Sequence, residues 1–188
     1  QQPPARPLQV FLKFDSGIYD DDLAFLKDLV ALLDSRLDEV QQAIDSSSDP
    51  DGMGHFDDAE YVAGMGFIAC QRYLASTYGP NGISKRIALE TGPRHSGGKT
   101  IAQIINAAAN FWKHLDEWEF HSTVFRDRAG LTPIQLETIQ VIETVTPWDD
   151  YTCANLLAAL AAPSPPRLKY LLPQLDAWRD ALDSVHVS

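Results

Sequence analysis

The side chains best suited to chemistry gather near the end of one amphipathic stretch, residues 99 to 120. They comprise an amide, an ammonium group, a carboxylate and two imidazoles: Asn110, Lys113, His114, Glu117 and His121. Such side chains serve as metal ligands and as groups that act on phosphate esters. The sequence therefore indicates this end of the stretch as the first place to look for a functional site.

Asn110 and His114 are four residues apart, which places both on one helical face. The pair resembles the Asn-x-x-x-His part of the HEPN superfamily motif, in which an Arg usually precedes the Asn; Ala109 is at that position here. The resemblance implies a helical bundle. It also implies, as in many members from bacterial toxin and phage-defence systems, a metal-independent ribonuclease in which His and Arg act on the RNA backbone. Carried over, Asn110 and His114 are the catalytic residues, and the missing Arg favours a degenerate, non-catalytic relative.

His114, Glu117 and His121 are spaced three and four residues apart, so a helix that continues to residue 121 aligns them as a transition-metal site. However, two histidines seven residues apart are separated by about 10 Å along a helix, too far to share one ion without a bend. We therefore expect these side chains to be exposed polar groups.

Residues 49 to 60 resemble the calcium-binding loop of an EF-hand. The ligands would come from five residues: Asp49, Asp51, His55, Asp57 and Glu60. Carboxylates take the first, third, ninth and twelfth positions, and a glycine stands at the tight turn. Met53 departs from the pattern, because an oxygen ligand is expected there, and no second loop is found. The alternative is an acidic loop in which Asp57 and Glu60 cap the next helix. We therefore expect no cofactor, and calcium is the one that this loop would bind if the resemblance holds.

The loop at residues 92 to 100 looks like a phosphate-binding loop, but its first glycine comes one residue too early and no buried strand precedes it. Nucleotide hydrolysis is therefore not expected. The N–H groups at the start of the following helix can still hold an anion beside Arg94, His95 and Lys99.

Apolar residues recur at helical spacing along most of the chain, so we predict an all-α fold. We expect one domain over residues 1–188, a bundle of about six helices, with an extended arm over residues 1–15. The arm alternates apolar residues as a strand does, but no partner strand is evident. The predicted helices span residues 20–45, 59–77, 83–90, 99–120, 132–144 and 149 or 150 to 162, and a C-terminal helix lies in residues 163–188 after a proline-rich corner.

The first predicted helix carries an apolar seam at steps of three and four residues that includes Leu33. Phe25, Leu29 and Leu32 widen the apolar face, which favours a helix inside a bundle over a dimeric coiled coil. In the second helix, Gly64 and Gly66 lower helix stability, so we expect another element to approach the backbone closely there.

Two helix starts carry the sequence pattern of a capping box. Thr100 is followed three residues later by Gln103, and Thr132 by Gln135, with Pro133 at the first helical position. These patterns predict where two of the helices begin.

The net charge of −11 comes from 26 acidic and 15 basic residues. It repels nucleic acid, so we expect no DNA partner, disfavour RNA, and favour a protein partner. No apolar run is long enough to span a membrane, so we expect no membrane contact and a cytoplasmic protein. The two cysteines, Cys70 and Cys153, are expected to be buried free thiols.

The preferred interpretation is a non-catalytic, acidic helical interaction module, a degenerate HEPN-like component of a bacterial defence or toxin–antitoxin system. The first alternative is a metal-independent HEPN-type ribonuclease that uses His114. The second is a calcium-binding protein that uses residues 49–60.

Overall fold

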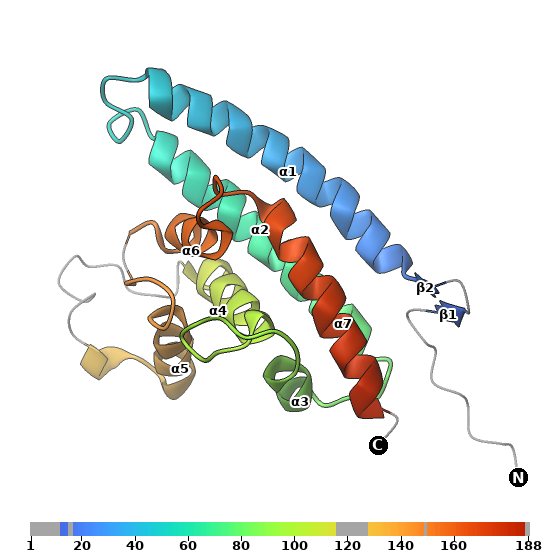
Figure 1. The fold of residues 1–188 in the computed structure, drawn as a ribbon. Helices are drawn as coiled ribbons and strands as arrows, with labels where there is room; N and C mark the ends of the chain where they lie inside the picture. Colours follow the sequence, from blue (N-terminus) through green and yellow to red (C-terminus); the bar gives the residue numbers. More distant parts are fainter. Residues whose placement is uncertain (1–11, 15–16, 116–127, 149, 187–188) are drawn as a thin grey trace, which may run out of the picture.

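The structure is a computed structural model that describes residues 12–14, 17–115, 128–148 and 150–186. Helices dominate the described chain, so the fold is all-α, as predicted (Figure 1). The α-helices are α1 (Asp21–Ser46), α2 (His55–Tyr78), α3 (Lys85–Glu90), α4 (Ile101–Lys113), α5 (Pro133–Ile142), α6 (Thr152–Ala161) and α7 (Leu172–His186). Two 3₁₀ segments are η2 (Arg128–Gly130) and η3 (Leu168–Leu171).

Helix α4 lies at the centre of the bundle, in contact with α2, α3, α5, α6 and α7. Helices α1 and α2 form a long antiparallel pair, and α2 also packs along α4 (Figure 1). The apolar side of α4 is buried in the core: Ile101, Ala102, Ile104, Ile105, Ala107, Ala108, Ala109 and Phe111. The chain is therefore organised around α4, and this helix positions the candidate site.

The starts of α4 and α5 agree with the predicted capping boxes. Thr100 and Gln103 form both reciprocal hydrogen bonds, and so do Thr132 and Gln135, with Pro133 in the first turn of α5. The end of α4 differs from the prediction, because the helix stops at Lys113 and not at residue 120. Residues 116–127 lie outside the described residues.

Helix α2 begins at His55, four residues earlier than predicted. Its N-cap is Gly54, which has a φ of 74°, and no side chain caps the helix. The left-handed backbone at Gly54 suits glycine and turns the chain into α2 directly from the loop. The predicted cap formed by Asp57 and Glu60 is therefore wrong.

The two glycines of α2 mark close approaches, as predicted. A Cβ atom on Gly64 would overlap the ring of Trp112 from α4, and one on Gly66 would overlap the side chain of Leu168 from η3. The missing side chains thus let α4 and η3 pack directly against the α2 backbone.

The seam of α1 departs from the prediction at its middle. The buried position between Val30 and Leu37 is Asp34, whereas Leu33 is only partly buried. The Asp34 carboxylate accepts hydrogen bonds from the backbone N–H groups of Leu168, at 2.7 Å, and Lys169, at 3.0 Å. A buried acid is stable here because it caps the start of η3.

The apolar face of α1 is narrower than predicted. Phe25 and Leu32 are 72% and 71% exposed, so they do not widen the buried face. Phe25 and Leu29 instead border a surface cavity between α1 and α2. The seam that packs in the bundle is the row of residues that includes Leu26 and Val30.

A small hairpin precedes α1. Strand β1 (Leu12–Phe14) pairs antiparallel with β2 (Gly17–Tyr19), which is the partner strand that the sequence did not reveal. Residues 1–11 of the predicted arm lie outside the described residues. No helix in the described ranges combines the length and the apolar composition needed to cross a membrane.

Both cysteines are free and buried, as predicted. Burial, followed by the nearby charge of Asp34, raises the pKa of the Cys70 thiol to about 12. Burial also raises the pKa of Cys153, with a further contribution from Glu60. Both thiols therefore act as apolar core groups at neutral pH.

Candidate functional site

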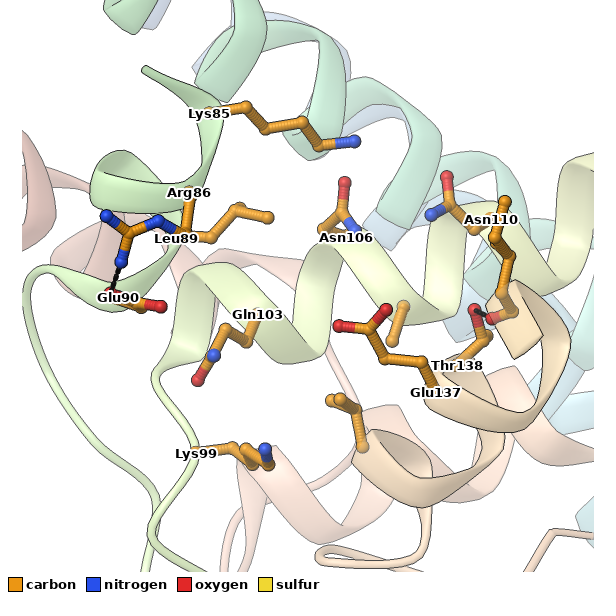
Figure 2. Close-up of a pocket in the computed structure, with 13 residues that line it drawn as sticks. Lys85, Arg86, Leu89, Glu90, Lys99, Gln103, Asn106, Asn110, Glu137 and Thr138 are labelled. Carbon is orange, nitrogen blue, oxygen red and sulfur yellow. Dashed lines mark hydrogen bonds and ion pairs between the residues drawn. The ribbon is translucent and has the colours of Figure 1, made fainter. Parts of the chain in front are cut away.

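Two adjoining cavities follow the polar side of α4. One, of about 330 Å³, lies between α3, α4 and α5, and is shown in Figure 2. The other, of about 350 Å³, lies between α2, α3 and α4. They share Lys85, Leu89, Asn106 and Asn110, so together they form one continuous depression, the α4 groove. The second is named the cationic cavity after its polar lining residues: Gln71, Arg72, Lys85, Asn106, Asn110 and Lys113.

The floor of the α4 groove is a polar stripe on an otherwise apolar helix. Gln103, Asn106 and Asn110 are spaced three and four residues apart, so their side chains emerge on one side of α4. Figure 2 shows Asn106 and Asn110 side by side on this floor. Because the opposite side of α4 is fixed in the core, the stripe has a defined orientation.

Gln71 of α2 organises the amides of the cationic cavity. Its Nε2 donates to Oδ1 of Asn106, at 3.0 Å, and to Oδ1 of Asn110, at 2.9 Å. Its Oε1 accepts from the Nζ of Lys113, at 2.7 Å. The amide oxygens of both asparagines are therefore occupied. Their amide nitrogens have no acceptor among the residues described here and remain as donors beside the cavity.

The cationic cavity contains positive charge without compensating carboxylates. Arg72, Lys85 and Lys113 line it, and the described part of its lining includes no acidic residue. Partial burial, and then repulsion from Lys85, lower the pKa of Lys113. Within the described ranges, neither Arg72 nor Lys85 forms an ion pair. Figure 2 shows the ammonium group of Lys85 extending over the groove towards Asn106.

The adjoining cavity has mixed charge. Lys99 and Arg86 line it together with Glu90 and Glu137. Arg86 is already paired with Glu90, at 3.2 Å. Glu137 projects from α5 on the side of the groove opposite α3 (Figure 2). The described lining of the cationic cavity therefore has cations only, whereas that of the adjoining cavity has both signs of charge.

The two predicted catalytic residues are placed differently. Asn110 lines both cavities, but its amide oxygen is held by Gln71. His114 is the exposed C-cap of α4, and it is not among the described residues that line the α4 groove. Ala109, at the position of the HEPN arginine, is completely buried and faces the core. The described site thus brings Asn110, but not His114, to the groove.

The other sequence candidates near α4 have separate outcomes. Glu117 and His121 lie outside the described residues. The guanidinium of Arg94 donates to the carbonyl oxygens of Gly98, at 2.8 Å, and Glu90, at 3.3 Å, so it holds its own loop together. Lys99, by contrast, lines the adjoining cavity.

Glu60, the twelfth residue of the predicted calcium loop, is buried at the start of α6. Its two carboxylate oxygens accept hydrogen bonds from the backbone N–H groups of Cys153, at 2.9 Å, and Ala154, at 2.7 Å. A carboxylate in this position neutralises the exposed N–H groups and the positive end of α6. Glu60 therefore has a structural partner in the absence of any ion.

The remaining residues of that loop are engaged separately. Asp49 accepts from the Gly52 N–H at 3.0 Å, and Asp51 accepts from the Tyr151 hydroxyl at 2.6 Å. His55 and Asp57 lie in the first turn of α2. Across the described parts of the chain, no three His, Cys, Asp or Glu side chains are grouped to hold a metal ion. Calcium binding by this loop stays an untested prediction, and the engagement of Glu60 at α6 disfavours it.

Sequence reasoning missed Gln71, Lys85 and Asn106. The spacing of Asn106 from Gln103 and Asn110 on one helical face was a visible signal. Gln71 gave none, because its role depends on which side of α2 packs against α4. Comparisons with protein-family models, with curated proteins and with solved structures give no match.

Proposed function

We propose that the protein is a non-catalytic helical interaction module that binds an anionic segment of a protein partner in the α4 groove. The observation that carries the proposal is the lining of the cationic cavity. Arg72, Lys85 and Lys113 line it without a carboxylate among the described lining residues, in a chain with a net charge of −11. Cavities lined by one sign of charge concentrate ligands of the opposite sign.

Several cations elsewhere in the bundle have acidic partners. Arg179 contacts Asp20 at 3.3 Å, and Arg167 contacts Asp38 at 2.5 Å. The chain has 26 acidic and 15 basic residues, so carboxylates outnumber the cations that they can pair with. The grouping of unpaired cations along α4 is therefore best explained by an anion that arrives with the partner.

A non-catalytic role is supported by the position of His114, because Asn110 lines the α4 groove whereas His114 is not among its described lining residues. Cleavage of RNA needs a cation that stabilises the charge developing on the phosphate, close to the group that transfers the proton. The cations of the described groove accompany Asn110, whereas His114 caps the end of α4 outside it. We further propose that the module is a degenerate HEPN-like component of a bacterial defence or toxin–antitoxin system.

A short segment of a protein is a better ligand than nucleic acid, because charge–charge interactions act only over a short range in salt. At physiological ionic strength, charges are screened beyond about 8 Å, so a short segment in the groove responds mainly to the local cations. A long nucleic acid would also extend beyond the groove and be repelled by the net charge of −11.

The test is binding of fluorescent peptides measured by anisotropy. Two anionic probes are used, a peptide rich in Asp and Glu and a peptide that contains phosphoserine, with an uncharged Asn- and Gln-containing peptide as reference. We expect an anionic probe to bind the parent protein and to be lost from a Lys85→Gln, Lys113→Gln double variant.

The matched control is a Lys27→Gln, Lys169→Gln double variant. It removes the same charge from α1 and η3, away from the groove, and should bind like the parent. Failure of both anionic probes to bind, or equal binding by the groove variant, would contradict the proposed function.

A further inference from the structure

We infer that the anionic group bound in the cationic cavity is a phosphate monoester. This inference rests on the proposed function and adds the chemical class of the group that is recognised. The phosphate can be carried by a phosphorylated side chain of the partner or by a small phosphorylated metabolite, and the experiment below separates these sources.

The polar lining of the cationic cavity offers donors and few acceptors. Gln71 occupies the amide oxygens of Asn106 and Asn110, which turns their amide nitrogens into the available groups. Lys85 and Lys113 are ammonium groups and can only donate. A phosphate monoester is complementary, because its three terminal oxygens are strong acceptors.

The charge of a phosphate monoester also suits the cations of the cavity better than that of a carboxylate. A carboxylate carries one negative charge, whereas a phosphate monoester carries about −1.5 to −2 at neutral pH. Lys85 and Lys113 are close enough for Lys85 to affect the protonation of Lys113, and Arg72 lines the same cavity. A dianion neutralises two such cations at once, which a single carboxylate cannot do.

The donors of the cavity come from several directions. The donors and cations come from three helices: Gln71 and Arg72 from α2, Lys85 from α3, and Asn106, Asn110 and Lys113 from α4. A planar carboxylate is best matched by two parallel donors from one side, as an arginine fork provides. A tetrahedral phosphate accepts from several directions, which suits a lining assembled from three elements.

The donors of the cavity are pre-organised by Gln71. Gln71 holds Asn106, Asn110 and Lys113 through three hydrogen bonds, so these side chains are ordered before a ligand arrives. Ordering in advance lowers the entropy that binding must otherwise oppose. Gln71 is therefore a positioning residue, which acts on a ligand through its neighbours.

The experiment is isothermal titration calorimetry of the parent protein with four probes. They are a phosphoserine peptide, the same peptide with Asp at that position, O-phosphoserine, and inorganic phosphate. We expect the phosphoserine peptide to bind about tenfold or more tightly than its Asp twin, because charge-assisted hydrogen bonds are added. Tighter binding of the peptide than of O-phosphoserine identifies a protein-borne phosphate. The reverse order identifies a metabolite, which keeps the phosphate inference and contradicts the protein partner of the proposed function.

The pH dependence of binding distinguishes a phosphate monoester from a carboxylate. The second pKa of a phosphate monoester is about 6, so its binding should strengthen between pH 5.5 and 7.5 as the dianion forms. Binding of the Asp peptide should not strengthen over this range, because its carboxylate is already ionised.

The matched variants act on the donors. Asn106→Asp keeps the side-chain shape but replaces a donor by an acceptor with negative charge, and should abolish phosphate binding. Gln71→Leu should weaken phosphate binding while Lys27→Gln leaves it unchanged, with the folded state of each variant checked by thermal unfolding.

Equal or tighter binding of the Asp peptide would overturn the phosphate inference and leave the proposed function standing. Absence of binding by every anionic probe would overturn both. Phosphate binding that persists in Asn106→Asp would also overturn the inference, because the cavity would not be its site.

Discussion

Lys85 and Lys113 line one cavity from α3 and α4, and no acidic side chain stands in the described part of that lining. The pKa of Lys113 is lowered by partial burial and, in second place, by Lys85. Gln71 holds the Lys113 ammonium group through a neutral amide oxygen, at 2.7 Å. The positive charges of Lys85 and Lys113 thus lie near each other, and Gln71 orients Lys113 without neutralising it. This is the arrangement that we expect of a preformed anion site.

This relationship predicts the direction of a pKa change. Lys85→Gln removes a positive neighbour, so the pKa of Lys113 should rise towards its ordinary value. A bound anion should raise it as well, because the charged form gains a partner. NMR titration of the Lys113 side chain measures both effects, and Lys27→Gln is the control. An unchanged Lys113 pKa in Lys85→Gln would show that the two groups do not interact in solution.

The buried seam of α1 can be tested with a pair of leucines. Leu26 is 3% exposed, so Leu26→Ala should lower the free energy of unfolding by about 2–5 kcal/mol. Leu32 is 71% exposed, and Leu32→Ala should change it by less than about 0.5 kcal/mol. Urea denaturation measures both values. Similar losses in the two variants would mean that the outer face of α1 is covered in solution.

Glu60 provides a test of the loop at residues 49–60. Glu60→Gln removes a charge-assisted hydrogen bond from the start of α6 and should lower the free energy of unfolding by about 1–3 kcal/mol in EDTA. Glu137→Gln, on an exposed acid, is the control. Because Glu60 is engaged at α6, we expect millimolar Ca²⁺ to leave the melting temperature unchanged. A rise that disappears in Glu60→Gln would instead establish a calcium site.

The proposed non-catalytic role has its own test. Single-stranded and structured RNA are incubated in EDTA with the parent protein and with His114→Ala. Because His114 lies outside the described lining of the groove, we expect the same background cleavage in both. Cleavage by the parent that is lost in His114→Ala would make the protein a metal-independent ribonuclease.

Short-range sequence patterns predicted the elements whose chemistry is local. The Thr100–Gln103 box fixed the start of α4, and the glycines of α2 indicated a close approach. Each of these depends on residues within one or two turns, or on the mere lack of a side chain. Such signals do not require knowledge of which helices pack together.

Groups whose partners are distant in the chain could not be predicted in the same way. Asp34 caps a segment 134 residues away, and Glu60 caps α6 at a separation of 93 residues. Gln71 meets Asn106 across 35 residues. In each case a polar side chain is satisfied by a helix whose position only the tertiary fold determines. This is why Glu60 resembled a calcium ligand and why the cationic cavity was not foreseen.

The most direct measurement of the central claim is an NMR titration of the side-chain amides with the anionic peptides. In the parent protein we expect saturable shifts of the Asn106 and Asn110 amide groups and of the Lys113 side chain. In the Lys85→Gln, Lys113→Gln variant, the shifts of the two asparagine amides should vanish. Shifts confined to residues outside the α4 groove, or no shifts with either peptide, would contradict it.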